Sequence, residues 1–270
     1  MKTLTDHTII YDEECPLCDL YTRTFLRTGM LDQHGREKFT AVEKCSKARV
    51  DWNRARNEIA LINKKNGSVL YGVDSLMKIL EYQWPLLKPL FANRIFHFLM
   101  QQFYFFISYN RKVIVPASVF EKQNTCTPDL NISYRWAYII FCWIITSLIL
   151  VSYSHLLVPV VPAGSYLREF TICGGQILFQ GSIVALVRKE KFIHYIGNLM
   201  TIALAGALLL SIALLLTSVI HSLLFYAIYF MLVVCLMFFE HIRRVKVLEL
   251  PFYLSAIWVI YRVLVLLIIL

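Results

Sequence analysis

The sequence predicts a protein in two parts, an α/β domain followed by an all-α transmembrane helical bundle of about five spans. The 270 residues are 58% hydrophobic, with a mean hydropathy of +0.58, which is too apolar for a soluble protein of this length. The charges are also uneven, with 18 Lys and Arg and 13 Asp and Glu up to Lys122, and 9 and 5 after it. We therefore expect a soluble domain at 1–116, a polar linker at 117–133 and a membrane domain at 134–270.

A buried strand at 8–11 is expected to deliver two cysteines to the start of a helix. Asp12, Glu13, Glu14 and the sequence Cys-Pro-Leu-Cys follow the strand directly and precede a helical pattern of apolar residues. Pro16 suits the first turn of a helix, where its missing N–H group costs no hydrogen bond. Cys15 then falls at the N-cap with Cys18 one turn further on, so that the two sulfurs can face each other.

This arrangement is typical of a dithiol redox site. The positive end of the helix dipole favours the thiolate of Cys15, and the thiolate is the form of a cysteine that attacks a disulfide. Asp12, Glu13 and Glu14 act in the opposite direction, because negative charge nearby disfavours a thiolate. The seven cysteines show no secreted disulfide framework, and a CxxC pair in a reducing compartment indicates catalysis or metal binding.

The rest of the first domain is expected to contain a strand at 38–42, a solvated helix at 45–56, a hairpin and a helix at 73–82. In the hairpin, Asn66 and Gly67 separate the apolar runs 58–63 and 68–71, and an Asn-Gly pair favours a tight turn between strands. This order of elements is that of a thioredoxin-like domain. No proline precedes residues 58–63, where thioredoxins carry a cis-proline that faces the dithiol.

An aromatic amphipathic helix is expected at 91–108. Polar residues interrupt its aromatic run at several positions. Such a helix can lie on the membrane surface, close over the CxxC motif or pack on the sheet, and the sequence leaves the three alternatives open.

The segment at 11–18 resembles the DCC family of thiol-disulfide oxidoreductases, named for one Asp and two Cys, whose members have a thioredoxin-like fold. The matching residues are Asp12, Cys15 and Cys18. The resemblance implies that Cys15 attacks a substrate disulfide, that Cys18 resolves the mixed disulfide, and that Asp12 tunes the thiol or relays its proton.

Two later segments also match this family. They are the turn into a helix at 71–76 and the end of the aromatic helix at Tyr109, Asn110 and Arg111. With them the resemblance covers about residues 8–116, and it says little about the membrane part.

Five apolar stretches follow residue 134, each long enough to cross a bilayer. They run over 136–157, 170–187, 196–216, 219–239 and 252–270. Basic residues gather in the loops after the second and fourth stretches, and by the positive-inside tendency both loops are cytoplasmic. We therefore expect an integral protein of a bacterial inner membrane, with its N-terminal domain cytoplasmic and Leu270 outside. No apolar stretch follows the first residues, so no cleavable secretory signal is expected.

Several polar residues fall within these stretches. Arg262 lies near the middle of the last one, where an unsatisfied charge costs about 3 kcal/mol or more, so it is a candidate functional residue unless backbone carbonyls or snorkelling satisfy it. Cys173, Gln176 and Gln180 share a face of the second stretch and favour close helix packing with hydrogen bonds between helices. Cys142 and Cys235 are expected to act as small hydrophobic residues.

The sequence thus predicts a membrane-bound thiol-disulfide oxidoreductase with Cys15, Cys18 and Asp12 as its catalytic residues and no cofactor. Its partners would be a protein or small-molecule disulfide or thiol substrate and a membrane electron carrier or membrane protein. A nucleic-acid partner is not expected, because no basic stripe accompanies the net charge of +9.

Two alternatives stay open. A non-enzymatic membrane assembly or metal-handling factor would bind Cu or Zn through Cys15 and Cys18, and His34 and Cys45 could complete a zinc site. Otherwise Cys45, like Cys126, is expected to be an ordinary surface thiol. A haem-bearing membrane electron carrier would use histidines at the ends of the stretches. These are His155, His194, His221 and His241.

Overall fold

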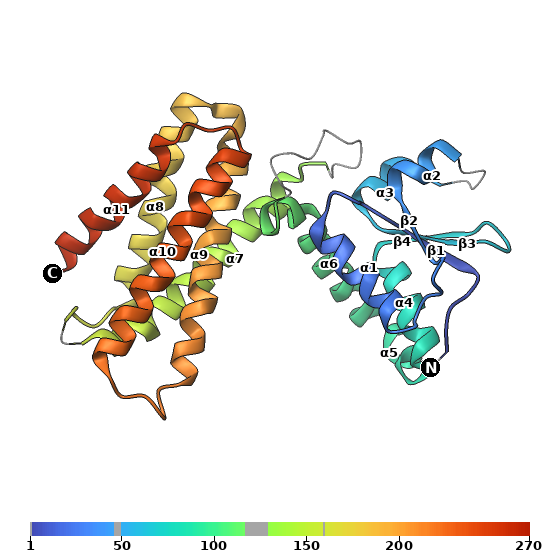
Figure 1. Cartoon of the computed structure of the whole chain (residues 1–270), viewed down its shortest axis with the longest axis horizontal. Helices are drawn as coiled ribbons and strands as arrows, with labels where there is room; N and C mark the ends of the chain where they lie inside the picture. Colours follow the sequence, from blue (N-terminus) through green and yellow to red (C-terminus); the bar gives the residue numbers. More distant parts are fainter. Residues whose placement is uncertain (1, 46–49, 117–128, 159) are drawn as a thin grey trace. The chain divides into compact units, whose positions relative to one another are not determined.

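The structure is a computed structural model and describes residues 2–45, 50–116, 129–158 and 160–270. The chain divides into two compact units, Met1–Tyr134 and Arg135–Leu270. The first is built on a four-stranded sheet, and the second consists of helices (Figure 1). Most of the expected linker, with Cys126, lies outside the described residues.

The sheet of the first unit has the strand order β2-β1-β3-β4. Its strands are β1 (His7–Tyr11), β2 (Arg36–Lys38), β3 (Ala60–Asn63) and β4 (Val69–Tyr71). β1 pairs parallel with β2 and antiparallel with β3, and β3 pairs antiparallel with β4. The parallel pair requires a crossover, which helix α1 (Pro16–Arg27) provides. This is the topology of a thioredoxin-like domain, as the order of elements predicts.

Alternating side chains of the central strands supply two apolar cores, one on each face of the sheet. Ile10 and Ile62 belong to the core that contains residues of α2 (Phe39–Cys45) and α3 (Trp52–Asn57). Ile9 and Leu61 belong to the core beneath α1, α4 (Gly72–Gln83) and α6 (Arg94–Ile114). Figure 1 shows these two groups of helices on opposite faces of the sheet.

The prediction of a strand at 38–42 is wrong in its position. β2 ends at Lys38, and α2 begins at Phe39. Phe39 and Val42 are both buried in the same core, and a spacing of three residues places them on one face of a helix, whereas side chains three apart in a strand point to opposite faces. The helix expected at 45–56 is shorter, because Asp51 caps α3 by accepting a hydrogen bond from the Arg54 N–H group.

The hairpin and the following helix are confirmed. Gly67 has a φ of +69°, which the turn between β3 and β4 requires and which glycine adopts without strain. The aromatic helix begins and ends later than expected, as α6. Asn93 sets its start by accepting hydrogen bonds from the N–H groups of Ile95 and Phe96. A short 3-10 turn, η1 (Pro85–Leu87), and α5 (Lys88–Phe91) precede it.

Four helices of the second unit are long and apolar enough to cross a membrane. They are α7 (Ile132–Ser154), α8 (Tyr166–Val187), α9 (Phe192–Leu215) and α10 (Leu223–Val247). α11 (Tyr253–Ile269) is also apolar but has 17 residues. The expectation of about five spans is consistent with these four helices and α11.

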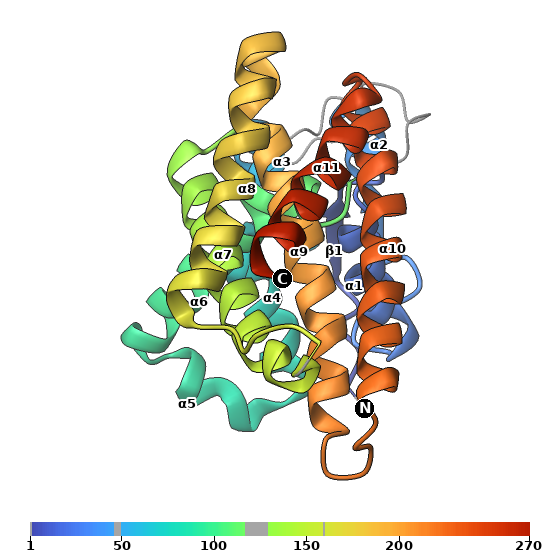
Figure 2. The ribbon, with the colours of Figure 1, turned by 90° about the vertical axis from the view of Figure 1, so that its left-hand side faces the viewer.

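The helices α9 and α10 form a tight antiparallel hairpin, and Figures 1 and 2 show them side by side. The predicted fourth stretch starts too early, because residues 216–222 form the connection. Ser222 caps α10 by accepting a hydrogen bond from the Phe225 N–H group. Tyr153 of α7 packs against this hairpin and donates a 2.8 Å hydrogen bond to the Tyr226 carbonyl.

Candidate functional site

Cys15 is the N-cap residue of α1, and Pro16 occupies the first turn, as the sequence predicts. The Cys15 backbone is extended, and its Sγ atom accepts a hydrogen bond from the Cys18 N–H group at 3.4 Å. The Cys15 N–H group donates in turn to the Asp12 carbonyl. The N–H groups of the first helical turn have no partner within the helix, and the sulfur of Cys15 accepts from one of them. This position stabilises negative charge on the sulfur.

The two thiols are shielded from solvent. Cys15 is 4% exposed and Cys18 6% exposed, and they cluster with Tyr11. Leu17 and Tyr21 pack against the same cluster. Because these side chains cover the two thiols, we expect the thiols to react with small reagents, or with a partner that displaces the covering side chains, more readily than with unspecific thiols in solution.

The two cysteines ionise very differently. The hydrogen bond between the two thiols lowers the pKa of Cys15 to about 7, and the charge of Arg111 and the Cys18 N–H group act in the same direction, against the burial of the sulfur. The same thiol-thiol hydrogen bond and burial hold the pKa of Cys18 well above its ordinary range. At neutral pH a substantial fraction of Cys15 is thus thiolate, while Cys18 stays protonated.

Arg111 is a site residue that sequence reasoning missed. Its Nη2 atom lies 2.9 Å from Oδ2 of Asp12, and both side chains are buried. Arg111 belongs to a segment that resembles the family, but nothing in the sequence connects it with Asp12, which is 99 residues away. A buried carboxylate is usually paired with a positive charge. The need of Asp12 for such a partner is the one sequence feature that could have pointed to Arg111.

The positive charge of Arg111 therefore outweighs the negative charge of Asp12 at the sulfur of Cys15. Asp12 raises the pKa of Cys15, but this influence is smaller than the opposing influence of Arg111. Oδ1 of Asp12 also accepts a hydrogen bond from the Glu14 N–H group at 3.1 Å. Asp12 thus lies beside the dithiol, fixed by Arg111 and by the loop that leads to Cys15.

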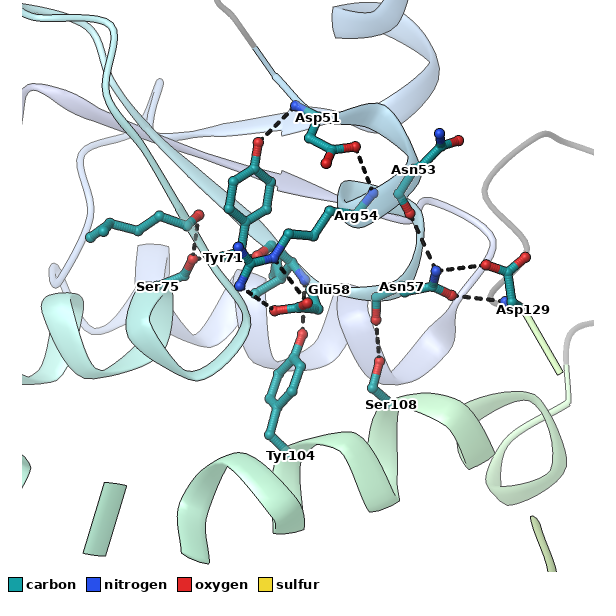
Figure 3. A network of polar contacts seen from close by, with 12 residues as sticks. Asp51, Asn53, Arg54, Asn57, Glu58, Tyr71, Ser75, Tyr104, Ser108 and Asp129 are labelled. Carbon is teal, nitrogen blue, oxygen red and sulfur yellow. Dashed lines mark hydrogen bonds and ion pairs between the residues drawn. The ribbon is translucent and has the colours of Figure 1, made fainter. Parts of the chain in front are cut away.

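One face of α6 fixes the loop before β3, as Figure 3 shows for two of its contacts. Tyr104 Oη accepts a 2.8 Å hydrogen bond from the Ile59 N–H group, and Ser108 donates to the Asn57 carbonyl. Arg111 Nη2 donates to the Arg56 carbonyl at 3.2 Å. Residues 104, 108 and 111 follow one another at helical spacing. Their hydrogen bonds hold the segment that corresponds to the cis-proline loop of thioredoxins.

Further polar contacts, made by residues in and next to α3, stabilise this loop (Figure 3). Arg54 forms an ion pair with Glu58, with 3.0 Å between Nε and Oε1, and its guanidinium lies over the ring of Tyr71. Asn57 exchanges two hydrogen bonds of 2.8 Å with Asp129. The loop is therefore held by side chains instead of by a proline.

The described residues offer little support for the alternative sites. His34 is exposed, and the side chain of Cys45 lies outside the described residues. Among the described residues, no group of three or more His, Cys, Asp or Glu side chains could hold a metal ion. His241 cannot easily bind haem, because Nε2 contacts Tyr195 Oη at 3.1 Å and Nδ1 contacts Ser255 Oγ at 3.0 Å.

Gln180 takes part in the same network in the second unit. It accepts a hydrogen bond from Tyr195 and donates one to the Leu254 carbonyl. Hydrogen bonds between helices, which the sequence predicts for this face of α8, are thus present. Arg262 lies in α11 beside Gln176 of α8.

One comparison with known proteins gives a match. Residues 9–115 match the DCC1-like thiol-disulfide oxidoreductase family. No curated protein and no solved structure matches the chain. The matched segment contains Asp12, Cys15, Cys18 and Arg111. The chain therefore carries a DCC1-like thiol-disulfide oxidoreductase domain at residues 9–115, followed by four apolar helices that could span a membrane.

Proposed function

We propose that the protein is a membrane-anchored thiol-disulfide oxidoreductase in which Cys15 is the attacking thiol and Cys18 the resolving thiol. The observation that carries this proposal is the N-cap position of Cys15, with the Cys18 N–H group at its sulfur and a pKa of about 7. A thiolate is the nucleophile in disulfide exchange, and a larger thiolate fraction at neutral pH favours a faster attack.

In the first step, the Cys15 thiolate attacks one sulfur of a substrate disulfide. A Cys15–substrate bond forms, the substrate S–S bond breaks, and the leaving substrate thiolate takes up a proton. Cys18 remains protonated during this step, because its pKa is raised by its hydrogen bond with Cys15.

In the second step, Cys18 attacks the Cys15 sulfur. Once Cys15 carries the substrate, it has no negative charge to hold the Cys18 proton, so the pKa of Cys18 falls. The Cys15–Cys18 disulfide forms, and the second substrate thiol leaves. The substrate gains two electrons, which the dithiol loses, and a thiol reductant restores the dithiol.

Asp12 is proposed as the residue that moderates the charge at the dithiol. It lies in the buried pair with Arg111, which is the positively charged group acting on Cys15. We propose the cytosolic side of a bacterial inner membrane for this domain. In support, Lys191 before α9 donates a 2.7 Å hydrogen bond to the Leu248 carbonyl directly after α10, so the basic turn before α9 and the basic last turns of α10 lie at one end of the helical unit.

A redox titration of the full-length protein in detergent tests the proposal. Cys15 and Cys18 should be alkylated together in reducing buffers and protected together in oxidising buffers, with one two-electron midpoint. Cys15→Ser should abolish exchange with a small aromatic disulfide, and Cys18→Ser should trap the mixed disulfide. Cys142→Ala, a buried cysteine of α7, is the matched control. Unchanged exchange by Cys15→Ser would exclude the proposed role.

A further inference from the structure

The helical unit contains a cavity of about 470 Å³ lined by residues of α7, α8, α10 and α11. This volume lies within the roughly 300–1,000 Å³ typical of small-molecule sites. Most of the lining is apolar, with Phe230, Phe238 and Leu266 among its residues. A smaller cavity of about 60 Å³ shares Gln176, Trp258 and Arg262 with it. These three polar residues are thus common to both cavities, and Arg168 and Glu169, which form an ion pair with each other, also line the larger one.

Arg262 brings a positive charge to this chamber. Its guanidinium carbon is 4.1 Å from the centre of the Trp258 ring, and Nη2 donates a long hydrogen bond of 3.4 Å to Gln176 Oε1. Among the described residues, no carboxylate forms an ion pair with Arg262, and its buried Nε atom has no hydrogen-bond partner. A charge in a membrane segment is costly unless a partner satisfies it.

Two neutral hydrogen-bond donors beside Arg262 are also buried without a partner among the described residues. Gln176 Nε2 and Trp258 Nε1 are buried and have no partner within the described part of the chain, and Trp258 is only 1% exposed. Both residues line the cavity. The N–H groups of guanidinium, indole and primary amide are donors. Leaving such groups buried and unpaired destabilises the folded protein.

We propose that this cavity binds a lipid-soluble molecule that has an apolar body and a head with hydrogen-bond-accepting oxygens. The head would accept hydrogen bonds from Arg262, Gln176 and Trp258, while the apolar walls bury the body. Quinones and long-chain carboxylates share this chemistry. The proposal stands on the cavity alone and does not depend on thiol exchange by Cys15.

Binding to the full-length protein in detergent tests the proposal with two probes, decylubiquinone and palmitate. The wild-type protein should bind at least one of them saturably. Arg262→Leu and Gln176→Leu should each weaken binding at least tenfold, because each removes donors from the cavity. Arg188→Leu is the matched control, since Arg188 is exposed outside the cavity, and it should bind as the wild type does.

A third variant, Arg262→Lys, distinguishes the two sources of the ligand. It keeps the charge and should retain most palmitate binding, whereas a quinone carbonyl that needs the guanidinium N–H groups should bind more weakly. Saturable binding of neither probe would overturn the proposal. Binding that both leucine variants leave unchanged would also overturn it, and the Gln176→Leu result decides this if Arg262→Leu does not fold.

Discussion

At the scale of single residues, the ionisation of Cys15 depends on two opposite charges that form one buried ion pair. Arg111 lowers the pKa of Cys15, and Asp12 raises it by less. The two charges therefore do not cancel at the sulfur, although they are paired with each other. Removing either partner should shift the reactivity of Cys15, in opposite directions.

The first prediction concerns this ion pair. The rate of Cys15 alkylation by iodoacetamide should rise with pH and reach half its maximum at about pH 7, because only the thiolate reacts. Arg111→Met should move this midpoint upward by about one pH unit, towards the ordinary value for cysteine, since an opposite charge is lost. Asp12→Asn should move it downward. The measurement is mass spectrometry of the peptide that contains Cys15.

Arg23→Met is the control for this prediction, because Arg23 lies on α1 with its side chain 56% exposed. Its midpoint should match that of the wild type. A shift of the same sign in Arg111→Met and Asp12→Asn would indicate a change in packing instead of a change in charge. That result would contradict the electrostatic role given to the pair.

At the scale of elements, the sequence was most informative where a pattern is local. The Asn-Gly turn, the N-cap cysteine and the apolar stretches each depend on neighbouring residues, and the structure confirms the elements they predict. The strand expected at 38–42 failed because Phe39 and Val42 suit a short helix as well as a strand. Arg111 was missed because its contact with Asp12 depends on tertiary folding across 99 positions.

The second prediction concerns the attachment of α6 to the loop before β3. Tyr104→Phe removes the acceptor for the Ile59 N–H group, and an unsatisfied buried donor costs about 1–3 kcal/mol. The apparent melting temperature of the full-length protein in detergent should therefore fall. Tyr82→Phe should leave it unchanged, because Tyr82 is 41% exposed and its hydroxyl forms no hydrogen bond with another residue that the structure describes. Equal melting temperatures for both variants would contradict this role of Tyr104.

The third prediction concerns the first half of α6. Its second half contacts the core under the sheet through Tyr104 and the loop before β3 through Ser108, whereas Ile95, Phe98 and Phe103 are each more than half exposed. In a protein with membrane spans, an exposed apolar helix face is suited to the bilayer interface. We expect this face to lie against lipid headgroups and upper acyl chains.

Photo-crosslinking measures this contact directly. A benzophenone analogue of phenylalanine in place of Phe98 should form lipid adducts in nanodiscs, detected by mass spectrometry. The same analogue in place of Leu20, an apolar residue of α1 that is 65% exposed, should form few. Equal lipid labelling at the two positions would contradict an interfacial role for α6.

At the scale of the whole molecule, the basic turn before α9 and the basic last turns of α10 lie at the same end of the helical unit. Lys191 before α9 contacts Leu248 directly after α10, and Tyr138 in the first half of α7 contacts Thr201 in the first half of α9 at 2.9 Å. The loop before α8 and the connection at 216–222 lie at the opposite end (Figure 1). By the positive-inside tendency, we expect the end where α7 begins to face the cytosol, and the chain connects the DCC1-like domain to that end.

The fourth prediction is that α11 crosses the membrane and places Leu270 outside. Its 17 residues extend about 26 Å at 1.5 Å per residue, close to the roughly 30 Å of the hydrocarbon core. In a bacterial host, alkaline phosphatase fused after Leu270 should be active, because that enzyme folds only outside the cytosol, and a fusion after Glu249 should be inactive. Replacing Leu264 and Leu267, two exposed apolar residues of α11, by Asp should prevent insertion and inactivate the first fusion. High activity of the fusion after Glu249 would reverse the proposed orientation, and inactivity of both fusions would show that α11 does not cross.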